Sequence, residues 1–195
     1  MRCSLNVVAF LLLTPLRLSP SDIFELAREE ADGFLAKQSD LNNLGVTVLL
    51  ATVLMSLSGR SGPIQDAATA LFIELLNGGN LAVQDTLFAH LDACDAESRL
   101  VSHADAMLEL SLQGLQESRK NGHLDSSNAS RIALAAKDCE TAQSMARFLQ
   151  LLCEGHHLAF QNYLRVQPAA SKQADLVKRL AGILVFLCDS THIVR

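Results

Sequence analysis

Apolar residues recur at intervals of three and four positions along most of this chain, a spacing that predicts helices with one buried stripe each. The run Leu44–Leu57 is apolar on every face, which predicts a helix buried on all sides. At about 14 residues, this run is shorter than the roughly 20 that a membrane span needs. The expected helices cover residues 19–37, 42–58, 63–76, 81–92, 97–120, 130–153, 158–166 and 174–187.

Polar segments rich in glycine, proline, asparagine and aspartate separate these helices. Pro63 is expected to begin one of them, since proline favours the first helical position. Asp95 and Ser171 are expected N-caps for the helices that follow them. Residues 122–130 are the candidate for a flexible loop, and residues 188–195 are expected to trail off without a cap.

Two stretches, Leu71–Phe88 and Phe148–Arg165, repeat one pattern at a spacing of 77 residues. In each copy a helix ends in a polar corner that contains glycine, and a second helix begins with L-A-V-Q (81–84) or L-A-F-Q (158–161). Internal repeats of this kind are typical of helix pairs that bury their apolar faces against neighbouring pairs. The pattern therefore predicts an all-α, armadillo-like α-solenoid of stacked antiparallel helix pairs over residues 19–195.

The corners themselves follow local rules. Glycines such as Gly78 take the positive φ that a sharp corner needs, and Asn80 is placed to cap the second helix. Gln84 and Gln161 lie at matching positions just inside the second helices. We expect each glutamine amide to bond free backbone groups at the corner below it, and we expect the corner histidines to cap through their ring nitrogens.

Composition supports a helical protein, since hydrophobic residues make up 49% and aromatics only 5%, with no tryptophan. The net charge of −5 comes without a Lys/Arg stripe, which argues against a nucleic-acid partner. Five cysteines are odd in number and scattered. This pattern indicates reduced, buried thiols in a cytosolic setting rather than a disulfide framework.

Residues 1–18 form a separate apolar N-terminal segment, for which two interpretations stay open. Met1-Arg2 followed by Leu5–Leu13 resembles the charged start and short apolar core of a secretory signal. Pro15 and Arg17 interrupt that pattern, and no small-residue cleavage site precedes Ser19. The alternative is a buried helix cut from the start of a longer array.

The residues predict no enzyme, because the chain lacks a P-loop and the G-x-G-x-x-G, G-x-S-x-G and H-E-x-x-H motifs. Cys153 and Cys188 fall at predicted helix C-termini, where the helix dipole opposes a thiolate. A second interpretation is that these two cysteines bind zinc together with His156, His157 and His192. Their spacing, however, is not that of a zinc finger. We therefore predict no catalytic residue, no metal, no cofactor and no small-molecule ligand.

The second copy carries a longer motif. F-L-Q-L-L-C-E-G-H-H at 148–157, followed by F-Q-N-Y-L-R at 160–165, resembles F-L-Q-L-L-C-E-x-H-x-x-x-x-Q-x-x-L/F-R. That pattern characterises the RyR and IP3R homology associated domain of inositol trisphosphate and ryanodine receptors. L-L-N-G-G-N at 75–80 with Val83-Gln84, and C-D-S-T at 188–191, are similar to flanking blocks of the same family. The resemblance covers about residues 71–191, with two departures: Gly155 replaces the usual Asn, and Asp95–Ala136 is short.

The resemblance implies a regulatory α-helical segment of an intracellular calcium-release channel that couples ligand binding to calcium release. Its expected partners are neighbouring domains of a larger channel chain and its homotetramer. The expected location is the cytosolic face of the endoplasmic reticulum membrane. The ligand core and the pore are expected outside this chain, and no membrane span is expected in it. A free-standing, cytoplasmic armadillo-like adaptor is the alternative. The residues at the family-motif corners, to which we assign a structural role, are Gly78, Gly79, Asn80, Gln84, Cys153, Glu154, His156, Gln161, Leu164 and Arg165.

Overall fold

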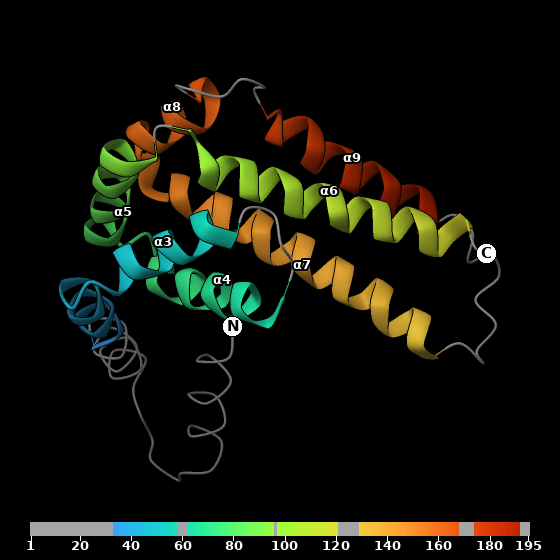
Figure 1. Cartoon of the computed structure of the whole chain (residues 1–195), viewed down its shortest axis with the longest axis horizontal. Helices are drawn as coiled ribbons and strands as arrows, with labels where there is room; N and C mark the ends of the chain where they lie inside the picture. Colours follow the sequence, from blue (N-terminus) through green and yellow to red (C-terminus); the bar gives the residue numbers. More distant parts are fainter. Residues whose placement is uncertain (1–32, 58–61, 96, 121–128, 168–173, 192–195) are drawn as a thin grey trace, which may run out of the picture. The chain divides into compact units, whose positions relative to one another are not determined.

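The computed structural model describes residues 33–57, 62–95, 97–120, 129–167 and 174–191 (Figure 1). Every element within these ranges is a helix, which confirms the predicted all-α class. The chain divides into two units, Met1–Lys37 and Gln38–Arg195, and the packing described below lies within the second. The predicted N-terminal segment 1–18 falls outside the described residues.

The helix bounds agree closely with those expected from the sequence between residues 63 and 166. The described helices are Gly33–Asn43, α3 (Val46–Leu57), α4 (Pro63–Leu76), α5 (Leu81–Cys94), α6 (Arg99–Lys120), α7 (Ala129–Cys153), the 3-10 turn η1 (Glu154–His156), α8 (Leu158–Val166) and α9 (Leu176–Thr191). Pro63 begins α4, as predicted.

The prediction for residues 37–58 is wrong in two respects. The first helix continues past Lys37 to Asn43, because no glycine or proline interrupts it before Gly45, whose φ of +82° makes the turn into α3. α3 is not buried on all sides, since Leu49 is 61% exposed. Its buried side packs on α4, α5 and α6.

Within the described ranges no single helix is long and apolar enough to cross a membrane. Only one pair of helices, Gly33–Asn43 and Val46–Leu57, has the length and composition of a membrane span, and this pair is bent by 66°.

The last helix also differs from its prediction. α9 runs to Thr191 and does not trail off after Leu187. Asp175 caps α9, its Oδ1 accepting the Lys178 N–H at 2.9 Å, whereas the predicted cap Ser171 lies outside the described residues. α9 packs on α6. Its Arg179 guanidinium forms ion pairs with two carboxylates of α6, those of Asp105 and Glu109, and Figure 1 shows α9 lying along α6.

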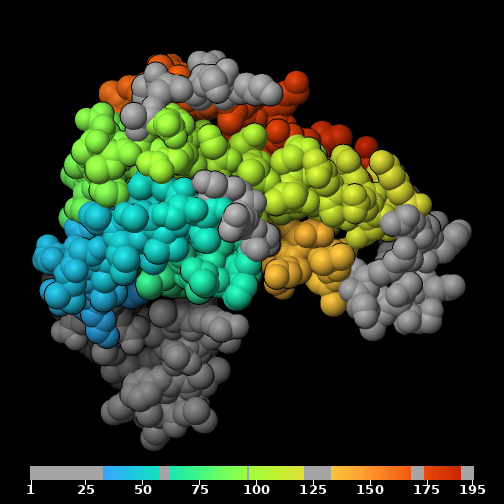
Figure 2. Space-filling view, viewed as in Figure 1, coloured from blue at the N-terminus to red at the C-terminus, as the bar shows by residue number. Residues whose placement is uncertain are grey.

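The first helices of the two repeated stretches, α4 and α7, pack against each other. Near the start of α4, Asp66 pairs with Lys137 of α7 at 3.8 Å. Further along both helices, the rings of Phe72 and Phe148 lie 5.3 Å apart and are fully buried. Contacts in this order show that α4 and α7 run in the same direction. In Figure 2 the side chains of α3 and α4, in blue-green, cover α7 except for its N-terminal half, in orange.

Other contacts join helices that are not neighbours in the chain. α3 packs on α6 as well as on α4 and α5, and α6 packs on both α7 and α9. In a regular solenoid each repeat contacts only its neighbours. The stacked-pair solenoid therefore stays a prediction, although equivalent helices of the two repeats do lie side by side.

Candidate functional site

The two corners that carry the motif residues lie at the C-terminal ends of α4 and α7. In the first corner Gly78 and Gly79 have φ values of +83° and +71°, and in the second Gly155 has a φ of +70°. These positive values, predicted from the sequence for the first corner, are the ones that glycine adopts without strain. His156 follows with a φ of +61°, in the same left-handed region.

We expect Gly78→Ala to lower the free energy of unfolding by about 1 kcal/mol, because only the backbone conformation opposes the new methyl group. A Cβ at this position meets no atom within 4 Å. Gly62→Ala is the matched control: its Cβ also has open space, but its φ of 171° is ordinary extended backbone. Urea unfolding followed by far-UV circular dichroism measures both. Equal effects of the two substitutions would contradict the conformational explanation.

Each second helix begins at a capping side chain. Asn80 Oδ1 accepts the N–H groups of Ala82 and Val83 at 3.1 and 3.3 Å, which confirms the predicted N-cap of α5. At the equivalent position, His157 Nδ1 accepts the N–H of Phe160 at 3.2 Å and caps α8. Of the two corner histidines, His157 therefore makes the predicted cap, and His156 is exposed.

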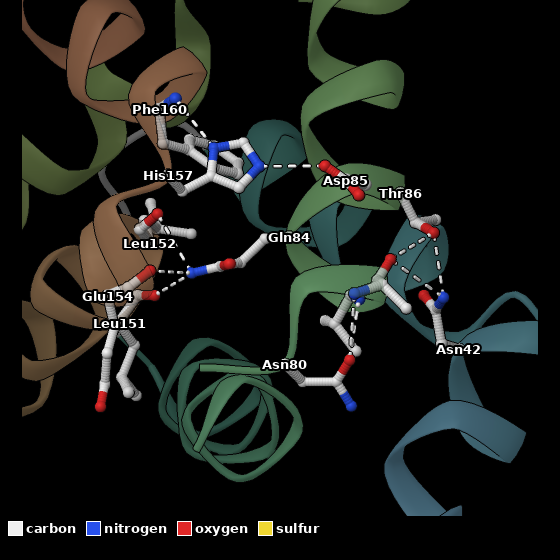
Figure 3. Close-up of polar contacts among 12 residues, drawn as sticks. Asn42, Asn80, Gln84, Asp85, Thr86, Leu151, Leu152, Glu154, His157 and Phe160 are labelled. Atoms are coloured by element: carbon white, nitrogen blue, oxygen red, sulfur yellow. Dashed lines mark hydrogen bonds and ion pairs between the residues drawn. The ribbon is translucent and has the colours of Figure 1, made fainter. Parts of the chain in front are cut away.

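The cap determines which ring nitrogen of His157 carries a hydrogen. Because Nδ1 accepts, Nε2 is the N–H donor, and it faces Asp85 Oδ1 of α5 at 3.1 Å (Figure 3). The His157 side chain is largely buried, while that of Asp85 is exposed. The same residue thus caps α8 and ties it to α5.

Gln84 lies at the centre of the contact between the two copies (Figure 3). Its Nε2 donates to the carbonyl oxygens of Leu151, Glu154 and Leu152 at 2.8, 3.0 and 3.4 Å. Carbonyls in the last turn of a helix have no intrahelical donor, and Gln84 is 0% exposed. Gln84 therefore caps the C-terminal end of α7. The prediction that it bonds the corner below its own helix is wrong, since it bonds the corner of the other copy.

The corner below α5 is capped by a residue that the sequence did not single out. Gln38 Nε2 donates to the carbonyls of Glu74 and Asn77 at 2.6 and 2.9 Å. Its Oε1 accepts from Asn80 Nδ2 at 2.9 Å, so the C-terminal cap of α4 is joined to the N-terminal cap of α5. Gln38 is 3% exposed.

The two glutamines perform the same task. Their acceptors occupy equivalent positions in the repeat, Glu74 matching Leu151 and Asn77 matching Glu154. In each case an amide on a helix earlier in the chain, separated by one intervening helix, supplies hydrogen-bond donors to the negative end of a helix dipole. The sequence signal that could have found these capping glutamines is the pattern Q-x-x-L, which begins at residues 38, 84 and 161. The same pattern also begins at residue 173, which lies outside the described residues.

Gln161 is the third glutamine of this series. It lies on α8 at the position equivalent to Gln84, yet its side chain is exposed. The expected bond to the corner below is not formed among the described residues. Nearby, the Arg165 guanidinium donates to Asn162 Oδ1 at 3.0 Å on the same exposed face, and Leu164 is half-buried against the core.

Aromatic rings fill the space between α5 and α8. Phe88 packs edge-on against Phe160 and Tyr163, with ring centroids 5.5 and 6.4 Å apart, and its ring also lies 6.2 Å from that of His157. Edge-to-face pairs are favourable beyond the area they bury. These rings and the hydrogen bonds of Gln84 join the two repeated units into one packed body.

The buried carboxylate of Asp95 follows the C-terminal end of α5 and joins α6 to α8. Asp95 accepts the N–H groups of Arg99 and Leu100 at 2.7 and 3.1 Å and the hydroxyl of Tyr163 at 2.8 Å. The predicted cap of α6 is therefore present, and it doubles as a tie to α8. Burial, the hydrogen bond to Asp95 and the charge of that carboxylate raise the pKa of Tyr163.

Cys153 and Glu154 lie where α7 ends. Glu154 packs its side chain against Gly79 of the first corner and pairs with Arg147 at 3.9 Å. Cys153 is half-buried, and burial raises the pKa of its thiol. The prediction of buried thiols is wrong for Cys94 and Cys188, which are exposed, and Cys139 and Cys153 are only half-buried.

We expect Cys153 to alkylate several-fold more slowly than Cys94 at pH 8. The thiolate is the reactive form, and a raised pKa lowers its population. Iodoacetamide labelling of the folded chain, followed by peptide mass spectrometry, measures both rates. Equal rates in the folded chain that remain equal in urea would show that burial of Cys153 has no effect.

The arrangement brings together hydrogen-bond donors, helix ends and rings. Among the described residues, no group of three or more His, Cys, Asp or Glu side chains is placed to hold a metal ion. Of the ten motif residues, Gly79, Gln84 and Glu154 take part in contacts between the two copies, whereas Gly78 and His156 are exposed. Gln161 and Arg165 face solvent.

Residues 136–194 match the family model described as RyR and IP3R Homology associated. This segment contains most of α7, the second corner, α8 and α9, and it confirms the family resemblance predicted from the motif. The C-terminal segment of the chain is therefore similar to a domain found in inositol trisphosphate and ryanodine receptors, which are channel proteins. Residues 71–135, to which the resemblance was extended, lie outside the match. No solved structure matches the chain.

Proposed function

We propose that this chain is a regulatory, non-enzymatic helical segment of an intracellular calcium-release channel of the inositol trisphosphate or ryanodine receptor type. The single observation that carries the proposal is the family match over residues 136–194. It spans the whole corner at which Gln84, His157 and Tyr163 tie α5 to α7 and α8. In this proposal the segment couples ligand binding to calcium release through contacts with neighbouring channel domains.

The geometry suits a relay of this kind. Each unit is joined to a helix earlier in the chain by a buried amide and an N-cap, so a displacement of one helix is passed to the next unit through short, directional bonds. The parallel course of α4 and α7 supports a longer armadillo-like array of such units. We place the parent channel, as a homotetramer, in the endoplasmic reticulum membrane with this segment on the cytosolic face, and its ligand core and pore in other parts of a longer chain.

The size of the native product tests this proposal against a free-standing adaptor. Long-read sequencing of the transcript and immunoblotting with an antibody to residues 122–130 are the measurements. A product several times larger than 21.1 kDa, encoding membrane helices and releasing calcium from microsomes, is the expected result. A stable native product near 21.1 kDa would overturn the channel and favour the cytoplasmic adaptor.

A further inference from the structure

Among the described residues, two glutamines cap helix ends, and a third glutamine at the equivalent position is exposed. Gln38 caps the end of α4, and Gln84, on the helix that follows α4, caps the end of α7. Gln161 stands at the equivalent position on α8, the helix that follows α7. The first two side chains are 3% and 0% exposed, whereas that of Gln161 is exposed.

We propose that the face of α8 that carries Gln161, Asn162 and Arg165 receives the C-terminal turn of a helix from a third helix–corner–helix unit, supplied by a partner polypeptide. The proposal rests on the interaction role proposed above and names the kind of partner. The face continues an interface that the chain forms twice internally. By the same geometry, Gln161 Nε2 donates to two or three carbonyls at the end of the partner helix.

Neighbouring positions on α8 fit the same occupant. Asn162 matches Asp85, which bonds the N-cap His157 of the following unit, so its amide is placed to meet the capping residue of the third unit. Arg165 takes the position of Phe88 and presents a positive charge, which is favourable beside the negative end of a helix dipole. These groups fit the exposed carbonyls and the negative end of a helix C-terminus.

Burial along α8 points in the same direction. Leu87 of α5 is 0% exposed, and its equivalent Leu164 is only half-buried. Leu87 belongs to the buried core cluster, whereas Leu164 only packs against it. A docked third unit adds the missing cover over Leu164.

The probe for the test is a hydrocarbon-stapled peptide of residues 66–90, which contains the end of α4, the first corner and the start of α5. Its Glu74 and Asn77 carbonyls, held by Gln38 in the whole chain, are free in the peptide. We expect saturable binding to the full chain, with ¹⁵N shift changes at the side-chain amide of Gln161. Gln161→Met is expected to weaken binding by about tenfold or more, because it removes the donors without changing the side-chain length.

The controls separate the possible outcomes. Gln150→Met, an exposed glutamine on α7, and a scrambled stapled peptide are expected to show no effect and no binding. Absence of binding, binding that ignores Gln161→Met, or binding lost only in Gln84→Met would each overturn the proposal. Self-association of the chain abolished by Gln161→Met would also overturn it, because the occupant would then be a second copy. The size of the native product tests the channel proposal alone, so that proposal and the binding proposal can fail independently of each other.

Discussion

Gln84→Met is expected to lower the free energy of unfolding by about 3 kcal/mol. The substitution keeps the length of the side chain but removes the two N–H donors that face the carbonyls of Leu151, Leu152 and Glu154. Leaving buried polar groups without a partner costs about 1–3 kcal/mol each, and the surrounding chain relaxes only in part. Gln84→Glu is expected to cost more at neutral pH, since a carboxylate would then face carbonyl oxygens. Urea unfolding followed by far-UV circular dichroism measures these changes.

Gln161→Met is the matched control, because Gln161 occupies the equivalent position of the second copy and is exposed. Its expected effect is below about 0.5 kcal/mol, as for other exposed sites. A similar loss in both variants would mean that the methionine, and not the missing cap, destabilises the helix. A negligible loss in Gln84→Met would show that the C-terminal end of α7 is satisfied in another way.

Asp95→Ala is expected to lower the free energy of unfolding by about 3 kcal/mol, combining a lost N-cap of about 1 kcal/mol with a buried Tyr163 hydroxyl left without its acceptor. Asp92→Ala, at an exposed position of α5, is the control and is expected to have little effect. Tyr163→Phe removes only the hydroxyl and is expected to cost about 1 kcal/mol. If Asp95→Ala and Tyr163→Phe prove additive in the double variant, the two groups do not interact.

The titration of Tyr163 tests the same contact independently. Tyr163 is the single tyrosine of a chain without tryptophan, so phenolate absorbance reports this residue alone. Its pKa in the folded chain is raised above the ordinary 10.0 by burial, the hydrogen bond to Asp95 and the Asp95 charge. The contact therefore stabilises the fold fully below pH 10 and progressively less as the pH rises beyond it. Asp95→Ala is expected to lower the pKa of Tyr163; an unchanged pKa in the folded variant would contradict this account.

The sequence predicts the local part of the candidate site well. The positive φ values of Gly78 and Gly79, the cap by Asn80 and the cap by Asp95 all depend on groups within a few residues of each other, so local rules are sufficient. It fails for Gln84, whose acceptors lie 67 to 70 residues away. It also fails to find Gln38, whose acceptors lie 36 and 39 residues away.

The failed burial predictions for Leu49, Cys94 and Cys188 have a similar origin. Leu49 belongs to an apolar run, and apolar character alone does not distinguish a helix buried on every side from one that packs on a single side. Cys94 and Cys188 are exposed although cysteine is usually a buried residue type. In both cases the neighbours that would cover the side chain come from distant parts of the chain.

The sequence alone therefore determines the helical class, most helix bounds between residues 63 and 166, the conformations of the corners and the family of the C-terminal segment. These properties follow from periodicity, from the backbone preferences of glycine and proline, and from motifs within short stretches. Only the tertiary structure decides that α4 and α7 run in parallel, that Gln38 and Gln84 cap helices other than their own, and that Gln161 stays exposed. Each of these depends on which helix lies beside which, and a hydrogen bond between distant residues leaves no periodic trace in the sequence.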